Sequence, residues 1–453
     1  MNVSTRSPTL RAETAAILER IDQRAYRVGI VGLGYVGIPL MLAAARAGFS
    51  VIGFDIDAER VAQLGNGVSS IKHIPSAAIA EALKSGRFEP TVDFGRIAEV
   101  DAIIICVPTP LTRNREPDLS FVENTARAIA PQLRKGHLVS LESTTYPGTT
   151  DEVLKPIFEA TGLTSGEDFF LAFSPEREDP GNQDFGTTAI PKVVGADGAD
   201  ALAIANALYS RLVVKTVPVS SSATAEAVKL TENIFRSVNI ALVNELKVIY
   251  GAMGIDIWEV IDAAKTKPFG FMPFYPGPGL GGHCIPIDPF YLSWKAREYE
   301  INTRFIELAG EINSSMPRLV VERLAEALDR RANRGLNGAR VLLIGLAYKK
   351  NVDDIRESPS LRLVEMIEQR GAVVDYHDPY VPVLPKTREH AALAGRKSVP
   401  LETDRIAGYD AVLIATDHDG IDYRALVSAA KLVVDSRNAC VRHGAFAENV
   451  VKV

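Results

Sequence analysis

The segment Gly32-Leu33-Gly34-Tyr35-Val36-Gly37 constrains the fold of this chain more than any other part of the sequence. It lies between an apolar run at residues 27–31, which predicts a strand, and a helical pattern at residues 38–47. A second apolar run follows at residues 50–55. Glycines at this spacing permit a tight turn, the approach of a pyrophosphate to backbone N–H groups, and close packing of the helix on the sheet. The segment therefore predicts a βαβ unit.

Asp55 closes the second strand, where dinucleotide-binding units carry an acidic residue. A carboxylate there accepts from both ribose hydroxyls and repels a 2′-phosphate, so we expect NAD rather than NADP. The cofactor contacts expected in this unit are Gly32, Gly34, Tyr35, Val36, Gly37 and Asp55. Arg60, on the following helix, is expected on the solvent side, packed against the cofactor. A glycine turn that serves only helix packing is the alternative.

Further apolar runs at residues 102–107, 138–141 and 169–173 are separated by helix-like segments. This alternation predicts a doubly wound parallel sheet, and such sheets bind ligands at the carboxyl ends of their strands. Four residues follow two of these ends and are expected to line a cofactor cleft: Pro108, Thr109, Ser143 and Thr144. Ordinary turn chemistry would explain either end alone.

A long helical stretch begins at three serines after Val219 and has few Gly or Pro residues as far as Met253. Its apolar residues recur at intervals of three, four or seven and form one continuous face. They are Val228, Phe235, Val238, Leu242, Leu246, Ile249 and Met253. A helix of roughly 30 residues is about 45 Å long, more than one small domain needs. We expect it to join two domains and to be buried in a homodimer or a higher homo-oligomer.

A second helical run at residues 302–331 leads to a boundary-like segment at residues 333–338. Short apolar runs at residues 340–346, 372–376, 411–415 and 431–435 then predict a second sheet, which lacks GxGxxG. The expected fold class is α/β, with two doubly wound, Rossmann-like sheets joined by a long central helix and a helical dimerisation domain. The expected divisions are an N-terminal extension at 1–25, an NAD-binding domain at 26–218, a central helical domain at 219–332 and a third domain at 333–453.

Composition excludes several classes of partner. The 453 residues carry a formal net charge of -6 without a basic stripe, so no nucleic-acid partner is expected. The cluster Arg330, Arg331 and Arg334 is interpreted as a solvated helix end. No apolar stretch approaches the ~20 residues of a membrane span, and residues 1–25 lack a signal-peptide pattern. We therefore expect a cytoplasmic protein with no membrane partner.

Three cysteines at wide spacing, Cys106, Cys284 and Cys440, argue against a disulfide framework or a CxxC metal site, and no metal is expected. Cys106 falls in a predicted buried strand and is expected to be an inert core thiol. Cys284 follows a loop dense in Gly and Pro, from Tyr275 to Gly282, whose backbone can wrap a ligand. A thiol at the start of a helix or turn is acidified by the dipole, so Cys284 is the predicted nucleophile. A small apolar cysteine in a loop is the alternative.

Two neighbours of Cys284 have different expected roles. Asp288, four residues later, would share its face in a helix and could position a water or a lysine. His283 is tempting as a base, but adjacent helical residues diverge by about 100°. We expect His283 to contact substrate or to be structural.

Lys229, Asn233 and Arg236 form a polar line on the long helix, at spacings of four and three. A buried lysine can stabilise a developing oxyanion, and an asparagine one turn later can hold a water. From spacing alone, a salt-bridged surface line explains these residues at least as well.

From about residue 27 to residue 437 the chain resembles the UDP-glucose/GDP-mannose dehydrogenase family. The matching motifs are the phosphate loop Gly32 to Gly37, Ser143-Thr144, Pro175-Glu176, Lys229 with Asn233, and the Gly-Gly-x-Cys-x-x-x-Asp pattern from Gly281 to Asp288. The family's C-terminal motif matches Tyr348-Lys349, Asp354, Arg356 and Ser358. The resemblance implies that the third domain binds the UDP-sugar and contacts NAD.

The resemblance also implies a reaction, the oxidation of a sugar CH2OH to a carboxylate with two NAD. Cys284 would be the nucleophile, and Asp288, Lys229 and Asn233 would surround the hydrolytic water. Glu176 would act as base or relay, and Thr144 would position the water or the nicotinamide. Arg356 would contact NAD. The implied substrate contacts are Glu176, Arg177, Lys229, Asn233, Arg236, Tyr275, Gly279, Gly281, His283, Tyr348 and Lys349.

Departures from the UDP-glucose enzymes indicate a branch of the family. Ser-Pro-Glu-Arg-Glu-Asp-Pro-Gly at residues 174–181 and Gly-Gly-His-Cys at 281–284 resemble the bacterial UDP-N-acetylglucosamine and UDP-N-acetylmannosamine 6-dehydrogenases. Residues 71–75 and 267–271 most resemble the N-acetylglucosamine enzymes of surface-polysaccharide pathways. UDP-N-acetylglucosamine is therefore the expected substrate, with UDP-N-acetylmannosamine or UDP-glucose as alternatives. The family's second glutamate has no counterpart in register, and Glu178 is the shifted candidate.

Two other classes of protein share part of this pattern. A two-electron β-hydroxyacid dehydrogenase has the N-terminal fold and a helical lysine but needs neither Cys284 nor a third domain. A non-catalytic NAD sensor would be expected to lose Cys284 or Lys229, and this chain has both.

Overall fold

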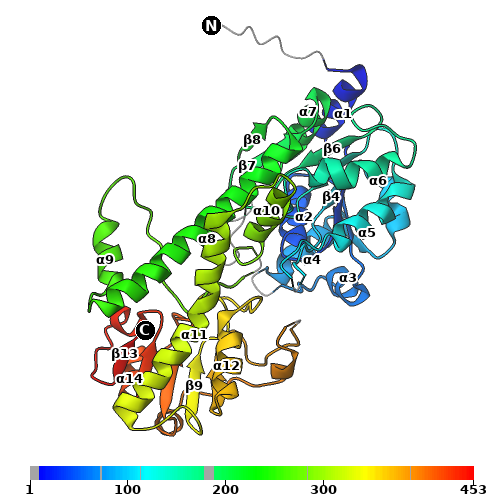
Figure 1. Cartoon of the computed structure of the whole chain (residues 1–453). Helices are drawn as coiled ribbons and strands as arrows, with labels where there is room; N and C mark the ends of the chain where they lie inside the picture. The colour runs from blue at the N-terminus through cyan, green and yellow to red at the C-terminus, as the bar shows by residue number, and fades with distance from the viewer. Residues whose placement is uncertain (1–9, 72–73, 113, 178–187, 283, 388) are drawn as a thin grey trace. The chain divides into compact units, whose positions relative to one another are not determined.

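A computed structural model describes residues 10–71, 74–112, 114–177, 188–282, 284–387 and 389–453 (Figure 1). The chain divides into two compact units. The first unit comprises residues 1–232 and 294–300, and the second comprises residues 233–293 and 301–453. The long helix α8, Ser222–Ala252, contributes residues to both.

The first unit contains an eight-stranded sheet in the order β3-β2-β1-β4-β5-β6-β7-β8. The six strands from β3 to β6 pair in parallel, whereas β7 runs antiparallel to β6 and parallel to β8. The strands are β1 Val28–Val31, β2 Val51–Phe54, β3 Phe88–Thr91, β4 Ala102–Ile105, β5 Leu138–Leu141, β6 Phe170–Phe173, β7 Lys192–Ala196 and β8 Thr216–Val219.

Helices cover both faces of this sheet, because the strands are apolar on both sides. Ala102 and Ile104 of β4 belong to one apolar cluster, and Ile103 and Ile105 belong to another on the opposite face. The helices of the unit are α1 Ala12–Asp22, α2 Gly37–Arg46, α3 Ala58–Gly65, α4 Ser76–Lys84, α5 Ser120–Ile129, α6 Lys155–Glu159 and α7 Ala199–Tyr209. The shorter helical segments are η1 Phe94–Glu99, η2 Ala130–Gln132 and η3 Thr150–Leu154.

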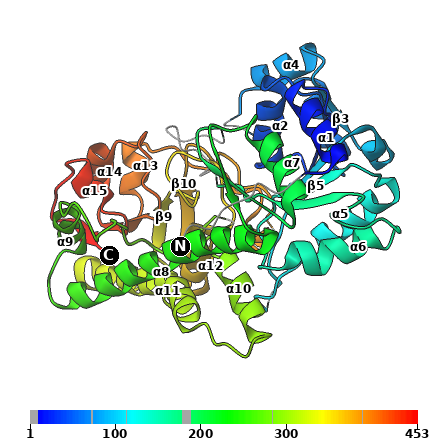
Figure 2. The same cartoon turned by 90° about the horizontal axis from the view of Figure 1, so that it is seen from above.

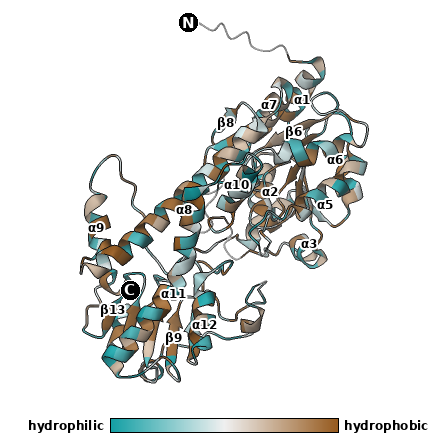
Figure 3. Cartoon of the chain, in the orientation of Figure 1, coloured by the Kyte–Doolittle hydropathy of each residue, from teal (hydrophilic) through white to brown (hydrophobic). Residues whose placement is uncertain are grey.

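The second unit contains a five-stranded parallel sheet in the order β10-β9-β11-β12-β13. Its central strands are also buried on both faces, and the strands around β9 are strongly hydrophobic (Figure 3). The strands are β9 Arg340–Ile344, β10 Val373–His377, β11 Ala411–Ile414, β12 Val433–Asp435 and β13 Val450–Lys452. The helices in this half of the sequence are α9 Ile257–Ala264, α10 Asp288–Arg297, α11 Arg304–Ala332, α12 Pro359–Gln369, α13 Thr403–Ala407, α14 Tyr423–Ala429, α15 Ala439–Arg442 and the short η4 Ala391–Leu393.

Helices α8 and α11 lie side by side in the second unit (Figures 1 and 2). The Asn244 amide donates to Asn313 Oδ1 at 2.9 Å, and the Asn313 amide donates to the Ser237 carbonyl at 3.0 Å. These buried amides connect the two helices by hydrogen bonds.

Two sheets of the same α/β class and a long central helix confirm the expected fold. The strands that sequence patterns did not indicate are β3, β7, β8 and β13. Three of these are edge strands, and β3 and β8 are partly exposed and contain proline, so they lack an apolar run. The reversal of β7 against β6 was also not expected.

The apolar face of α8 is only partly covered by the described part of the chain, since Phe235 meets Phe274 edge-on and Leu246 packs on a small apolar cluster. Phe235, Leu242 and Ile249 are 46%, 49% and 46% exposed, and they recur every seven residues. No helix among the described residues, α8 included, combines the length and the apolarity needed to cross a membrane.

Candidate active site

The turn after β1 has three glycines with three different surroundings. Gly32 has a φ of 95°, and a Cβ there would lie 2.6 Å from the Cys106 carbonyl oxygen. A Cβ on Gly37 would lie 1.9 Å from the Gly32 oxygen, so only glycine allows α2 to begin so close to the turn. A Cβ on Gly34 would meet open space. The turn therefore has an accessible backbone at the start of a helix, which fits the pyrophosphate of NAD.

Asp55 follows β2 and is only 5% exposed. Its Oδ2 accepts from Leu33 N at 2.8 Å, and its Oδ1 accepts from Asp57 N at 3.0 Å. Arg60 Nη1 also lies 3.0 Å from Oδ2. The carboxylate therefore holds the glycine turn, and Arg60 is directly paired with it.

The ends of β4 and β5 lie next to each other, as expected, because these strands pair in parallel. Ser143 Oγ donates to the Val107 carbonyl at 2.6 Å, which links the two ends. Thr109 is buried and Thr144 is half-buried, whereas Pro108 is exposed. The next residue, Thr145, is fully buried, and its hydroxyl has no hydrogen-bond partner in the described part of the chain. We did not single out Thr145 from the sequence.

Cys106 lies just after β4 rather than within it, and it is half-buried rather than buried. Its side chain packs against the core of the first unit. Desolvation raises the pKa of its thiol well above the usual value, and the nearby Glu142 adds to this shift. The thiol stays protonated at neutral pH, consistent with the expected inert role.

A buried charge cluster lies beyond these strand ends. Lys192 at the start of β7 is 4% exposed, and its Nζ lies 2.7 Å from Glu142 Oε2 and 3.3 Å from Glu176 Oε2. Burial raises the pKa of Glu142 to about 7, against the attraction of Lys192, and Glu176 adds to the rise. Two carboxylates thus compete for one ammonium. We did not single out Glu142 or Lys192 from the sequence, although Glu142 directly follows the apolar run at residues 138–141.

Glu176 also contacts the long helix through its backbone. Lys229 on α8 is almost fully buried, and its Nζ donates to the Glu176 carbonyl at 2.6 Å. The adjacent Arg177 forms an ion pair with Glu232 on α8 at 2.5 Å and donates to the Pro191 carbonyl at 2.6 Å. The structure therefore brings Glu176, Arg177 and Lys229 together. The shifted candidate Glu178 lies outside the described residues.

Another buried carboxylate, Glu226, fixes the loop after β5 to α8. It accepts from Gly148 N at 2.6 Å and from the backbone and hydroxyl of Thr150 at 2.9 and 2.7 Å. Burial raises its pKa to about 7. We did not identify Glu226 from the sequence, although it lies one turn before Lys229 on the predicted helix.

In the second unit, Asn233 and Asp288 meet. Asn233 Nδ2 donates to Asp288 Oδ2 at 2.6 Å, and both side chains are buried. Asp288 begins α10, and its backbone N donates to the Cys284 carbonyl at 2.8 Å. Cys284 therefore lies in the turn that leads into α10, as expected. The third residue of the polar line, Arg236, is exposed and does not share this buried environment.

The glycine-rich loop before Cys284 packs on the C-terminal motif. A Cβ on Gly281 would lie 2.4 Å from Tyr348 Cβ, and Gly282 N donates to the Arg356 carbonyl at 2.9 Å. Gly279 has a φ of 137°, and a Cβ at this position would lie 3.1 Å from Pro359 Cβ. The loop therefore needs glycine for this approach. His283 lies outside the described residues.

The remaining residues expected to contact NAD or substrate have varied surroundings. Arg356 forms a short ion pair with Asp354 at 2.6 Å, and Lys349 is half-buried. Tyr275 donates from its hydroxyl to Asp262 at 2.7 Å on α9. Arg437, which we did not single out, packs so close to Gly277 that a Cβ there would lie 2.5 Å from its Nη1. Among the described residues, no group of three or more His, Cys, Asp or Glu side chains could hold a metal.

The glycine turn with an acidic strand end, and the cysteine loop packed on the C-terminal motif beside a second Rossmann-like sheet, fit an NAD-dependent dehydrogenase. The chain belongs to the UDP-glucose/GDP-mannose dehydrogenase family. Residues 26–213 match the family's NAD binding domain, residues 223–315 its central domain, and residues 342–442 its UDP binding domain.

Individual relatives cover nearly the whole chain. It is 36% identical to UDP-N-acetyl-D-glucosamine 6-dehydrogenase of Pseudomonas aeruginosa over 86% of this chain and 90% of the relative. It is 34% identical to UDP-N-acetyl-D-mannosamine dehydrogenase of Pyrococcus horikoshii over 91% and 95%. The solved structure of a UDP-D-ManNAc dehydrogenase from Pyrococcus horikoshii superposes with a TM-score of 0.82 at 33% identity, covering 94% of this chain and 97% of the other.

Proposed function

We propose that this enzyme oxidises C6 of UDP-N-acetylglucosamine to the carboxylate, for surface-polysaccharide synthesis. The observation that carries the proposal is Cys284, placed in the turn before α10 with the Asn233–Asp288 hydrogen bond in the next turn. A two-electron dehydrogenase needs no such nucleophile. The choice of sugar is supported by the Gly-Gly-His-Cys variant and by the relative with 36% identity. UDP-N-acetylmannosamine and UDP-glucose are the alternatives.

NAD, when bound, accepts one hydride from C6 in each of two oxidations. After the first oxidation, Cys284 Sγ bonds to the aldehyde carbon, and the thiol proton goes to the aldehyde oxygen. The second oxidation of this thiohemiacetal leaves a thioester on Cys284. Water then adds to the carbonyl carbon, the C–S bond breaks, and the acid leaves as the thiol is restored. One alcohol, two NAD and one water thus give one carboxylate, two NADH and three protons.

Hydrolysis of the thioester requires a positioned water. We assign this role to Asp288 and Asn233, whose side chains are already hydrogen-bonded in a buried site. Lys229 lies one turn before Asn233 on α8 and would stabilise negative charge on the sugar oxygen. Glu176 would act as the base or relay, since its carboxylate is held by Lys192. Thr144 would position the water or the nicotinamide.

The other binding roles follow the same proposal. The residues assigned to NAD are Gly32, Gly34, Tyr35, Val36, Gly37, Asp55, Arg60, Pro108, Thr109, Ser143, Thr144 and Arg356. Those assigned to the UDP-sugar are Glu176, Arg177, Lys229, Asn233, Arg236, Tyr275, Gly279, Gly281, His283, Tyr348 and Lys349. Residues 26–218 would bind NAD, residues 219–332 would carry Cys284, and residues 333–453 would bind the UDP-sugar.

The exposed face of α8 supports a homodimer. Phe235, Leu242 and Ile249 form a row at seven-residue spacing, which is the repeat with which two copies of a helix pack together. A second copy of the chain is the occupant that we propose for this face. Sedimentation analysis should give a dimer for the wild type and a shift toward monomer for Leu242→Glu.

The direct test of the proposed reaction is a product count. Purified enzyme is supplied with UDP-N-acetylglucosamine, UDP-N-acetylmannosamine or UDP-glucose, and NADH is counted per sugar consumed. The proposal expects two NADH and one acid, with the highest kcat/KM for UDP-N-acetylglucosamine. One NADH per sugar with release of free aldehyde would overturn the four-electron reaction.

A further inference from the structure

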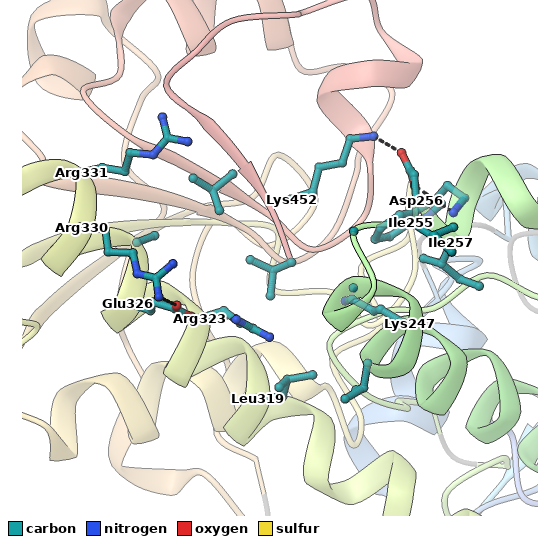
Figure 4. A pocket seen from close by; sticks show the side chains of 17 residues that line it. Lys247, Ile255, Asp256, Ile257, Leu319, Arg323, Glu326, Arg330, Arg331 and Lys452 are labelled. Atoms are coloured by element: carbon teal, nitrogen blue, oxygen red, sulfur yellow. Dashed lines mark hydrogen bonds and ion pairs between the residues drawn. The ribbon is translucent and has the colours of Figure 1, made fainter.

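A cavity in the second unit is lined by none of the residues assigned above. Its volume is about 440 Å³, within the range of about 300–1,000 Å³ that small-molecule sites occupy. The end of α8, the start of α9, one face of α11 and the strand β13 form its walls (Figure 4). All of the residues that line it belong to the second unit.

Lys247 of α8 is the unusual residue of this cavity. It is 7% exposed, and its Nζ has no hydrogen-bond partner in the described part of the chain. Its Nζ lies 5.4 Å from the centroid of the Trp258 ring. Burial, with help from Arg437 and Arg323, lowers the pKa of Lys247 to about 7. A buried ammonium group with three unmet donors is costly, and an anion in the cavity would supply the missing acceptor.

The charges around Lys247 favour an anion as well. The cavity is lined by five basic side chains, Lys247, Arg323, Arg330, Arg331 and Lys452, and by two acidic ones, Asp256 and Glu326. Glu326 accepts from both Arg323 and Arg330 at 2.8 Å, so it balances only one of them. Lys452 pairs with Asp256, and Arg331 donates to an uncharged carbonyl, that of Glu448. With Lys247 protonated, the side chains that line the cavity carry an excess of three positive charges, and the nearby Arg437 and Asp435, outside the lining, have opposite signs.

We propose that this cavity binds a small phosphate-bearing anion with at least two negative charges, contacted by Lys247 and Arg323. Arginine forks and lysine ammonium groups match phosphate oxygens in geometry and charge. The volume also leaves space for a group larger than inorganic phosphate. This site is additional to the proposed dehydrogenase reaction and does not depend on it.

Calorimetric titration of the full-length enzyme tests the site. The enzyme is first saturated with NADH and UDP, so that the dinucleotide and UDP sites are filled. It is then titrated with inorganic pyrophosphate and, separately, with UMP. We expect one remaining site per chain for at least one probe. The tighter probe then distinguishes an inorganic polyphosphate from a nucleotide as the source of the phosphate.

Variants connect that binding to the cavity. Lys247→Met should weaken the probe by about tenfold or more, because it removes the buried donor while keeping an apolar stem. Lys397→Met changes the net charge equally at an exposed position outside the cavity and should leave the affinity unchanged. Arg323→Met, at the more exposed wall, is the second variant, and it should also weaken binding of the probe. Absence of binding in the wild type, or equal affinity in Lys247→Met, would overturn the proposal, whether the cavity is empty or covered by a second copy.

Discussion

Asn233 Nδ2 donates to Asp288 Oδ2 across 2.6 Å, so a residue of the long helix holds the carboxylate that begins α10, four residues after Cys284. Both side chains are buried. A buried carboxylate that loses such a donor reorients or takes up a proton. The contact therefore links the orientation of the proposed water-binding group to α8.

Asn233→Leu should lower kcat by about 100-fold or more, the range observed when general acid–base groups are displaced. The loss should fall on hydrolysis, so that a thioester on Cys284 accumulates and is visible by intact-protein mass spectrometry. Asn239→Leu provides the matched control on the same helix, because the Asn239 side chain bonds only to the Phe235 carbonyl among the contacts described. Equal kcat in both variants would remove Asn233 from the mechanism.

Asp55 should make NADP a poor substitute for NAD, because its carboxylate would stand against the 2′-phosphate. Asp55→Asn should raise the ratio of kcat/KM for NADP over NAD by about tenfold. Arg60 remains in place in this variant and can then face the 2′-phosphate, since Asp55 Oδ2 no longer neutralises it. Comparable kcat/KM for the two cofactors in the wild type would show that Asp55 does not select between them.

Glu142 predicts a pH dependence of stability. Its pKa is raised to about 7 in the folded protein by burial, so the folded state holds a proton that the unfolded state has already lost above about pH 4.5. The stability contributed by that proton is fully present below pH 4.5 and is lost as pH rises through 7. Glu142→Gln should therefore gain stability relative to wild type between pH 5 and 8, by up to about 3 kcal/mol. Urea unfolding of both proteins at pH 5 and pH 8 measures the difference in their free energies of unfolding. A difference that does not change with pH would contradict the prediction.

Lys247 predicts a stability that rises with pH, opposite to the effect of Glu142 and in a different pH range. Its pKa is lowered to about 7, so between pH 7 and about 10.5 the unfolded state binds more protons and stability rises with pH. The cost of burying the charge is complete below pH 7. Lys247→Met should thus stabilise the ligand-free protein by a few kcal/mol at pH 6, and the gain should shrink toward pH 10. Thermal unfolding against the exposed control Lys397→Met tests this, and no gain at pH 6 would contradict it.

Much of the fold could be predicted from local patterns. The glycine turn at residues 32–37, the fully apolar run of β4 and the buried run of β5, whose one polar residue is Ser140, predict a doubly wound sheet. Strands buried on both faces have no regular polar alternation. Edge strands such as β3, which is half-exposed and contains Pro90, give no such signal. The reversed pair β7 and β8 depends on how the chain returns to the sheet, which no local pattern encodes.

The candidate site was only partly predictable for a related reason. Motif spacing identified the candidates Cys284, Asp288, Lys229 and Asn233. Helical spacing predicts which residues share one face of a helix, but it does not predict which residues of other elements they contact. The Asn233–Asp288 contact and the Glu142–Lys192 pair join residues 55 and 50 positions apart. Such contacts follow from tertiary packing. Arg60 shows the same limit, since its ion pair with Asp55 was not expected from the sequence.

The central claim is that Cys284 acts covalently after the first oxidation, and Cys284→Ser tests it most directly. Serine keeps the size of the side chain but replaces an ionisable thiol by a hydroxyl that is a poorer nucleophile. Binding of NAD and of UDP-N-acetylglucosamine should change little, whereas acid formation should collapse. Intact-protein mass spectrometry should show an adduct on the serine, or a carbonyl reagent should detect bound aldehyde. Acid formation at close to the wild-type rate would contradict the account.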